Sequence, residues 1–245
     1  MIPKIIHLCW LSGDPYPEKI QRCISSWEHH LPDYQIMLWD ANRFDVDSTL
    51  WTKEAFSMKK YAFVADYIRF YAVYHYGGIY LDSDVEVLSS FNNLLNLPYF
   101  VGREVHEEWL EIAAFGAEKG CQWVKDCLDY YSERHFTNDG CPAPRILTPL
   151  LASKYDLTFI DGPESFKDDN RSIYVFPNHF FCGQTKKGED GKLKYNVRSN
   201  TYCVHQFTNT WRDNCRGPLH NFVAGILNIY PNYLGRHFKF FNKKK

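Results

Sequence analysis

The sequence lacks the signals that mark several common classes of protein. Its eight cysteines form no C-x-x-C pair, so neither a zinc ribbon nor a redox motif is written in it. The stretch MIPKIIHLCWLSGDPYP has one lysine and a short apolar run broken by His7, which is too weak for a signal peptide and too short for a membrane span. A net charge of -1 gives no basic field of the kind that nucleic-acid binding needs. We therefore expect a cytoplasmic protein with reduced cysteines and no nucleic-acid partner.

Apolar residues are plentiful enough for a substantial core. With 245 residues, 45% of them hydrophobic, the chain is expected to form one domain, which we place over residues 1–235. Residues 236–245, RHFKFFNKKK, form a basic tail with three phenylalanines. This tail could hold the protein at the inner face of an anionic membrane, or it could be a solvated chain end.

Hydrophobic patterning predicts strands that alternate with helices. Apolar runs of strand length occur at KIIHLCWL, YQIMLWD and GIYLDSD, and helical spacing occurs over 17–30 and 59–76. Gly77 and Gly78 supply the stop of the second helix. Later segments predict a strand at PYFVGR, a helix over 122–134, a turn-rich stretch at TNDGCPAPRILTP, and strands at SIYVFPNHFF and TYCVHQF on either side of a loop or hairpin at TKKGEDGKLK. This alternation predicts an α/β fold with a mainly parallel central sheet.

Two aspartates follow the predicted strand GIYL in the stretch HYGGIYLDSDVEVL. In an extended chain residues i and i+2 point to the same side, so Asp82 and Asp84 can both face one point beyond the strand end. Ligands of open α/β sheets bind at the carboxyl ends of the strands, and two carboxylates there suit a divalent cation. A solvated acidic turn is the alternative.

Two more groups of polar residues could complete a site. Asp66 and Arg69 lie three residues apart on the helix predicted over 59–76, and hence on one face. They would form either a weak surface ion pair or a polar pair that grips hydroxyl groups of a ligand. His205, in VHQFTNTW, is a candidate third metal ligand.

These segments together resemble a known family. IPKIIHLCW, FVADYIRFYAVYHYGGIYLDSDVEVL and HQFTNTW are similar to the glycosyltransferases of family 32, whose D-x-D region also resembles that of glucosylating bacterial toxins and capsular polysaccharide glycosyltransferases. The resemblance implies the GT-A type of nucleotide-sugar-binding α/β fold. It also implies a retaining hexosyltransferase that moves a sugar from a nucleotide diphosphate donor, with UDP favoured, to a glycan, polysaccharide or lipid-linked saccharide acceptor. Such an enzyme would serve polysaccharide or capsule biosynthesis.

The resemblance further implies roles for individual residues. The implied catalytic residues are Asp66, Arg69, Asp82 and Asp84. The implied donor-binding residues are Trp10, Tyr80, Asp82 and Trp211. The implied metal ligands are Asp82, Asp84 and His205. Within these sets, Trp10 stacks on the donor base, Asp84 is the direct metal ligand, and Trp211 lies near the diphosphate.

The chemistry of sugar transfer agrees with these roles. Departure of a nucleotide diphosphate builds negative charge, which a divalent cation stabilises as a Lewis acid. Carboxylates joined by an imidazole favour Mn²⁺ over Mg²⁺. The resemblance, with no obvious carboxylate nucleophile in the sequence, further implies front-face attack by the acceptor hydroxyl, with the departing phosphate taking its proton.

Two other classes fit parts of the sequence. Phosphatases of the haloacid dehalogenase type use D-x-D-x-[TV] after an apolar strand, but there the motif ends the first strand, whereas YLDSDV ends the third predicted strand of this chain. A non-catalytic carbohydrate-binding module would explain the surplus of tyrosine and tryptophan. Such a module would not need Asp66, Asp82 and Asp84 together.

Overall fold

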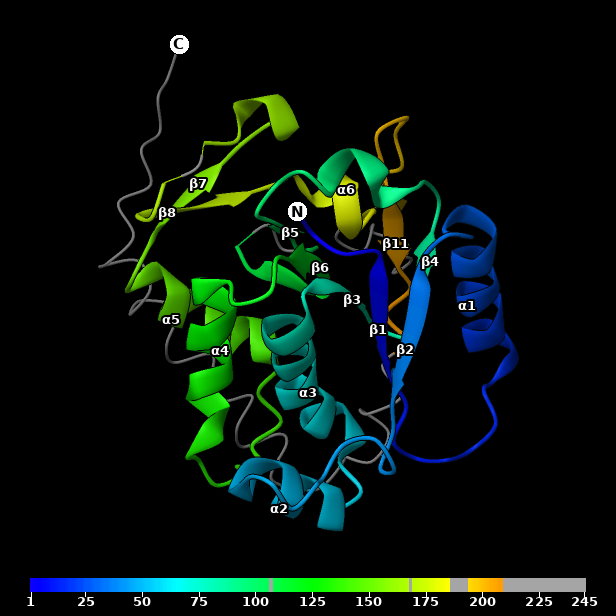
Figure 1. The fold of residues 1–245 in the computed structure, drawn as a ribbon, viewed down its shortest axis with the longest axis vertical. Coiled ribbons are helices and arrows are strands. Elements are labelled where there is room, and N and C mark those ends of the chain that lie inside the picture. Colours follow the sequence, from blue (N-terminus) through cyan, green and yellow to red (C-terminus); the bar gives the residue numbers. More distant parts are fainter. Residues whose placement is uncertain (106–107, 168, 186–193, 209–245) are drawn as a thin grey trace. The chain divides into compact units, whose positions relative to one another are not determined.

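The computed structural model describes residues 1–105, 108–167, 169–185 and 194–208. The elements below belong to a compact unit of residues 1–136 and 141–208 (Figure 1). Its α-helices are α1 (Glu18–His30), α2 (Leu50–Ser57), α3 (Tyr61–Tyr76), α4 (Gln122–Ser132), α5 (Ala143–Ala152) and α6 (Asn178–Phe181). Its strands are β1 (Ile5–Cys9), β2 (Gln35–Trp39), β3 (Gly78–Leu81), β4 (Val85–Val87), β5 (Tyr99–Arg103), β6 (Leu110–Ala117), β7 (Asp156–Phe159), β8 (Ser172–Val175), β9 (Gln184–Thr185), β10 (Lys194–Tyr195) and β11 (Cys203–His205).

The central sheet has the strand order β2-β1-β3-β6-β5. β1 pairs in parallel with β2 and with β3, whereas β6 pairs antiparallel with β3 and with β5. β5 therefore runs in the same direction as β1, β2 and β3, and β6 runs against them. The predicted α/β class with a mainly parallel central sheet is confirmed, and the antiparallel β6 is a feature that the sequence analysis did not anticipate.

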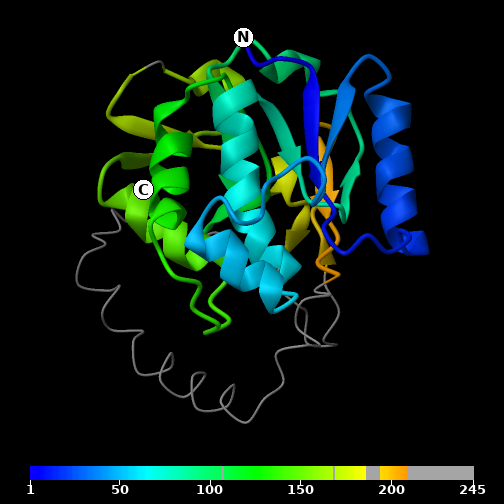
Figure 2. The same ribbon diagram turned by 60° about the horizontal axis from the view of Figure 1, so that its bottom comes forward.

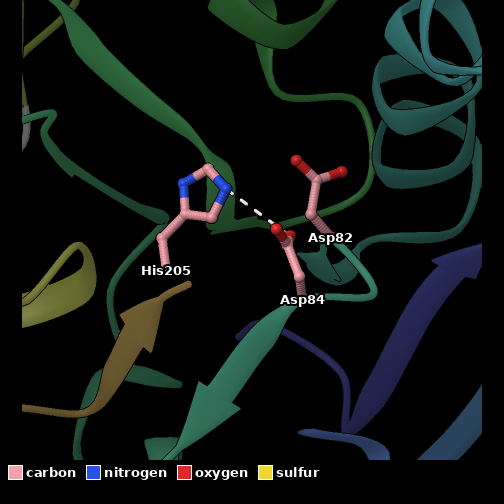
Figure 3. Close-up of side chains that lie close together, drawn as sticks. All are labelled: Asp82, Asp84 and His205. Atoms are coloured by element: carbon pink, nitrogen blue, oxygen red, sulfur yellow. Dashed lines mark ion pairs between the residues drawn. The ribbon is translucent and has the colours of Figure 1, made fainter. Parts of the chain in front are cut away.

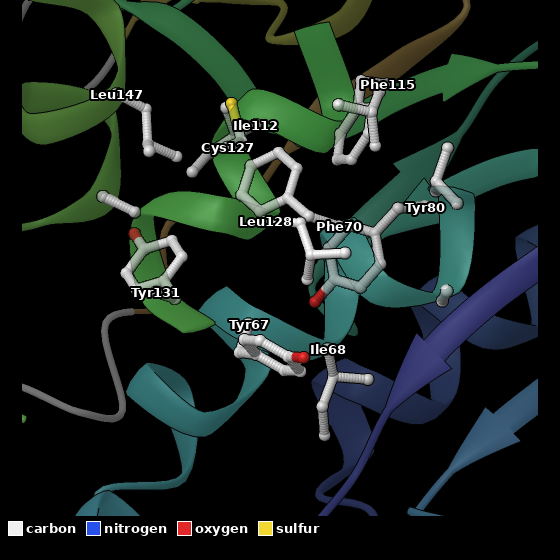
Figure 4. Packing of buried hydrophobic residues seen from close by; sticks show 14 of the residues in the cluster. Tyr67, Ile68, Phe70, Tyr80, Ile112, Phe115, Cys127, Leu128, Tyr131 and Leu147 are labelled. Carbon is white, nitrogen blue, oxygen red and sulfur yellow. The ribbon is translucent and has the colours of Figure 1, made fainter. Parts of the chain in front are cut away.

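Apolar side chains cover both faces of this sheet because residues alternate along each strand. On one face Tyr80 and Phe115 pack with α3 and α4, and Figure 4 shows these rings beside Phe70 and Tyr131. On the other face a second core contains Trp27 of α1 together with side chains of β4 and α6. In Figures 1 and 2 α3 lies between α4 and the parallel strands. A sheet buried on both faces leaves its strand ends as the open place for ligands.

The glycine pair after α3 is required by both conformation and space. Gly77 ends the helix with φ 67°, and Gly78 follows with φ 109°, backbone angles that residues other than glycine rarely adopt. A Cβ atom on Gly78 would lie 2.6 Å from the backbone oxygen of Ile5 in β1. The pair therefore stops α3, as predicted, and lets β3 approach β1 closely enough to pair with it.

Most elements predicted from the sequence are present, with three corrections. Only Ser172–Val175 of SIYVFPNHFF is a strand, because Pro177 is followed by the short helix α6. The stretch predicted to be rich in turns contains α5. Pro142 and Pro144 lie where a helix tolerates proline, at the N-cap and in the first turn, and Pro149 lies inside the helix. α2, β4, β6 and β7 were not predicted. β9 and β10 pair antiparallel on either side of the predicted loop, whose residues 186–193 lie outside the described ranges.

Several predictions concern residues that the structure does not describe. Trp211, Cys215 and the tail 236–245 lie outside the described ranges, so the extent of the domain to residue 235 and the membrane role of the tail stay predictions. Within the described ranges Cys9, Cys23, Cys121, Cys127, Cys182 and Cys203 form no disulfide, and the expectation of a reducing compartment stays a prediction. None of the helices among the described residues combines the length and the apolar character needed to cross a bilayer.

Candidate functional site

A tight turn between β3 and β4 places the two aspartates of the D-x-D motif. β3 ends at Leu81, and the backbone N–H of Asp82 donates to the Ala113 carbonyl oxygen of β6 at 2.8 Å. The chain then turns, because the N–H of Val85 donates back to the carbonyl oxygen of Asp82 at 2.9 Å. The carboxylates converge through this turn and not, as we expected, through the alternation of an extended strand. The predicted location at the carboxyl end of a central strand is correct.

His205 returns from the other end of the chain to complete a cluster with these aspartates. β11 pairs antiparallel with β4, which places His205 opposite Val85. One ligand atom from each of Asp82, Asp84 and His205 lies within 4.8 Å of the others, and Figure 3 shows the three side chains facing one another. Nε2 of His205 lies 3.5 Å from Oδ1 of Asp84. The three predicted metal ligands are therefore gathered at one point.

The second carboxylate oxygen of Asp84 has its own partner. Both the backbone N–H and the hydroxyl of Thr208 donate to Oδ2 of Asp84, each at 2.8 Å. Burial alone would raise the pKa of Asp84, but His205 and these two hydrogen bonds hold it well below its usual range. For His205, burial would lower the pKa, but the carboxylates of Glu111 and Asp84 raise it well above its usual value. Asp84 and His205 therefore each stabilise the charged form of the other.

Asp66 and Arg69 form a buried pair beside the cluster. Nη2 of Arg69 lies 3.0 Å from Oδ1 of Asp66 and 3.4 Å from Oδ1 of Asp82, and the Arg69 side chain is only 7% exposed. Nη1 of Arg69 donates to the carbonyl oxygen of Ile112 in β6 at 2.9 Å. The alternative of a weak surface ion pair is therefore wrong, because α3 points both side chains into the protein.

Burial and charge act against each other in this pair. Burial raises the pKa of Asp66 to about 7, although the Arg69 guanidinium pulls it down. Burial likewise raises the pKa of Asp82, again opposed by Arg69. For Arg69 itself burial would lower the pKa, but Asp82, Tyr80 and Asp66 outweigh it and raise the pKa further, so the guanidinium is always charged. Asp66 can thus hold or release a proton close to neutral pH.

Tyr80 holds the carboxylate of Asp82 through a hydrogen bond. Its hydroxyl donates to Oδ1 of Asp82 at 2.7 Å, and its ring lies 4.8 Å from the guanidinium carbon of Arg69. Tyr80 is buried, whereas the Asp82 side chain keeps 27% of its surface exposed. The tyrosine therefore orients Asp82, and Asp82 presents the open surface on which a ligand can bind.

Trp10 follows β1, the neighbour of β3 in the sheet. Its indole N–H donates to the carbonyl oxygen of Asp14 at 2.7 Å, and its ring meets that of Tyr16 edge to face, with the centroids 4.8 Å apart. The ring is half-buried. A contact between Trp10 and a nucleotide base stays a prediction.

Comparison with known proteins identifies the segment that contains most of this site. Residues 17–101 match the family described as "Glycosyltransferase sugar-binding region containing DXD motif". Residues 17–101 are such a sugar-binding region. It includes Asp66, Arg69, Tyr80, Asp82 and Asp84, whereas Trp10 and His205 lie outside it. The family match decides against the phosphatase alternative.

The chain also has relatives among curated proteins. Inositol phosphoceramide mannosyltransferase 3 of Schizosaccharomyces pombe is 35% identical over 106 residues, which are 42% of this chain and 30% of that protein. Mannosyl phosphorylinositol ceramide synthase SUR1 of Saccharomyces cerevisiae is 34% identical over 108 residues, which are 41% of this chain and 27% of that protein. The match thus spans less than a third of the length of these relatives.

Two solved glycosyltransferase structures also align with the chain. The PaToxG glycosyltransferase aligns with a TM-score of 0.47 and 17% identity, over 62% of this chain and 68% of the other. The galactosyltransferase LgtC aligns with a TM-score of 0.38 and 13% identity, over 63% of this chain and 75% of the other.

Two residues that contact the Asp82, Asp84 and His205 cluster were missed by the sequence analysis. Glu111 of β6 lies beside His205, and Thr208 caps Asp84. Glu111 could have been noticed, because it is an acid within the otherwise apolar run LEIAAFGA. Thr208 has no comparable signal, since threonine is common in loops.

Proposed function

We propose that this chain is a metal-dependent, retaining glycosyltransferase that uses a nucleotide diphosphate sugar as donor. The observation that carries the proposal is the convergence of Asp82, Asp84 and His205 within 4.8 Å, inside and beside a DXD sugar-binding region. Retention of configuration is supported by the family resemblance. In this proposal Asp82, Asp84 and His205 hold the cation.

The ligand atoms of Asp82, Asp84 and His205 fit a divalent cation. Ligands of Mn²⁺ or Mg²⁺ bind at about 2.0–2.2 Å, so ligand atoms on opposite sides of one ion lie up to roughly 4.4 Å apart. The separation of 4.8 Å or less in the cluster is compatible with this limit after small movements of the side chains. One imidazole among carboxylates favours Mn²⁺. When bound, such an ion supplies Lewis-acid stabilisation of the charge on the departing diphosphate.

The protein's own groups would prepare the donor for transfer. Tyr80 and Arg69 both contact Oδ1 of Asp82, which fixes that carboxylate while its exposed surface faces the ligand. Asp66 contacts Nη2 of Arg69, the same nitrogen that faces Asp82, and has a pKa of about 7, so it can accept a hydrogen bond from a sugar hydroxyl or donate one to it. Thr208 fixes the rotamer of Asp84. Binding and orientation by preset side chains is the contribution this site makes to the reaction.

The identities of donor and acceptor are further parts of the proposal. The relatives are named as mannosyltransferases or mannosyl phosphorylinositol ceramide synthases, so mannose joins the candidate donor sugars. Their names also favour a lipid-linked acceptor over a capsular polysaccharide. The UDP preference from the sequence resemblance stays open to test beside GDP-mannose.

A thermal-shift panel tests donor and metal together. A donor that binds only the folded protein raises its midpoint of unfolding. We expect one of UDP-glucose, UDP-galactose and GDP-mannose, with Mn²⁺, to raise the midpoint of the wild type. Asp84→Asn should lose this shift while keeping an oxygen for the Thr208 hydrogen bonds, and the exposed control Asp161→Asn should retain it.

Product analysis then separates the alternatives. Release of nucleoside diphosphate with the α configuration of the sugar kept, followed by proton NMR of the product, would support a retaining transferase. If none of the nucleotide sugars raised the midpoint of unfolding of the wild type in the presence of Mn²⁺, the proposal would be contradicted. Sugar binding that persists in chelator, without any nucleotide binding, would favour the carbohydrate-binding module instead.

A further inference from the structure

Glu111 is a buried acid that the proposed catalytic set does not include. It lies on β6, and its side chain is only 2% exposed. Oε1 accepts a hydrogen bond from the backbone N–H of Ala113 at 2.9 Å. Burial of a carboxylate is costly unless other groups compensate its charge, so this residue must have a strong partner.

The charge-compensating partner of Glu111 is the imidazole of His205, and the thiol of Cys182 also contacts Glu111. Nδ1 of His205 lies 3.4 Å from each carboxylate oxygen of Glu111, while Nε2 lies 3.5 Å from Oδ1 of Asp84. The ring is therefore held between two carboxylates, one at each nitrogen. Glu111 contacts the ring nitrogen opposite the one that faces the aspartates.

We infer that Glu111 is a positioning residue, which holds the Nδ1–H of His205 and so directs Nε2 toward the cation. This inference rests on the proposed metal-dependent function. An imidazole that binds a metal through one nitrogen usually donates the other N–H to a carboxylate or carbonyl, which fixes the tautomer and the ring orientation. Glu111 is placed for that role, because it reaches Nδ1 and leaves Nε2 free to face Asp84.

The backbone of β6 links this support to the D-x-D turn. The N–H of Ala113 holds Glu111, and the carbonyl oxygen of the same residue accepts the N–H of Asp82. His205 is tied independently, since its backbone N–H donates to the carbonyl oxygen of Cys182 at 2.9 Å. The relative positions of imidazole and aspartates therefore depend on Glu111 as well as on strand pairing.

The test measures Mn²⁺ affinity of the full chain by the EPR signal of free Mn²⁺. Glu111→Met keeps the length of the side chain but removes the acceptor, and we expect it to weaken binding by about 10–100-fold. Glu111→Gln, whose amide oxygen still accepts, should recover most of the affinity. The exposed Glu28 on α1 provides the matched control Glu28→Met, which should bind like the wild type.

A second variant separates positioning from a general loss of structure. If Glu111 acts through His205, Glu111→Met should cause no further loss of affinity in a His205→Ala background. Electron spin echo modulation by the imidazole nitrogen should be present with Mn²⁺ in the wild type, absent in His205→Ala, and diminished in Glu111→Met. A merely structural role would lower affinity equally in both backgrounds.

A further measurement needs no variant. With ¹¹³Cd²⁺ as a diamagnetic probe, nitrogen NMR of the wild type should show a proton on Nδ1 of His205 and cadmium coupling at Nε2. The reverse pattern, or equal Mn²⁺ affinity and modulation in Glu111→Met and the wild type, would overturn the inference and leave the proposed function standing. Failure of the wild type to bind either ion would overturn the proposed metal dependence and the inference with it.

Discussion

The buried Asp66 should make the protein less stable as the pH rises toward neutral. Its pKa is raised from 3.8 to about 7, chiefly by burial. Between these values the folded state binds a proton at Asp66 that the unfolded state has released. Because the folded state then binds more protons than the unfolded state, the free energy of unfolding falls as pH increases. Above pH 7 both states are ionised and the change is complete.

The size of the effect follows from the shift. One pKa unit corresponds to 1.36 kcal/mol, so the titration of Asp66 between pH 4.5 and 7.5 removes at most about 3 kcal/mol from the free energy of unfolding. Asp66→Asn cannot ionise. The difference in stability between Asp66→Asn and the wild type should therefore change in favour of the variant by up to about 3 kcal/mol over this range.

Urea unfolding followed by circular dichroism at a series of pH values measures this difference. Comparison with the wild type cancels groups that titrate in both proteins, and the exposed control Asp161→Asn should run parallel to the wild type. Loss of the contact with Arg69 changes the stability of the variant by an amount that does not depend on pH, because the effect of Arg69 on ionisation is already contained in the pKa of Asp66. Parallel curves for Asp66→Asn and the wild type would refute the argument that burial raises this pKa.

Three other predictions follow from contacts in the same region. Gly78→Ala should lower the free energy of unfolding, measured with urea, by at least about 1–3 kcal/mol, because φ is 109° and the new Cβ would lie 2.6 Å from the Ile5 oxygen. The loss should be larger than for the control Gly13→Ala, where φ is also positive but no atom lies within 4 Å of the new Cβ. Tyr80→Phe removes the hydrogen bond to Asp82 and should weaken donor binding, measured by calorimetry, by about 0.5–1.5 kcal/mol; unchanged affinity would show that Tyr80 does not orient Asp82. Chelation by EDTA should abolish the donor-induced thermal shift, and added Mn²⁺ should restore it; a shift that survives EDTA would contradict metal-dependent binding.

Much of the site could be predicted because short sequence patterns indicate its chemically active residues. The D-x-D pair, the i,i+3 spacing of Asp66 and Arg69, and the glycines after their helix are all short patterns with a direct physical meaning. His205 was included because a cation site with two carboxylates needs further ligands. Local patterns could not predict which of these side chains contact the same carboxylate oxygen. Whether Arg69 binds Asp66 alone or also Asp82 depends on the distance between α3 and the turn after β3.

β6 shows why the remainder could not be predicted. LEIAAFGA is apolar apart from Glu111, so its sequence does not indicate the direction of the strand. Its pairing with β5 shifts register between Val101 and Gly102, which changes the course of the strands beside Glu111. Such an irregularity depends on partners that are distant in sequence. The acidic Glu111 was the only chemical signal in the run.

The contribution of β6 to the site is made largely by its backbone. The carbonyl oxygen of Ile112 accepts from Arg69, the carbonyl oxygen of Ala113 accepts from Asp82, and the N–H of Ala113 holds Glu111. None of these contacts uses the side chain of Ile112 or Ala113, so residue type at these positions carries no trace of the role. Because one antiparallel strand contacts the arginine, the D-x-D turn and the support of His205, its position sets the distances among all three. The site therefore depends on the one central strand that runs against its neighbours, and the direction of that strand follows from the fold as a whole.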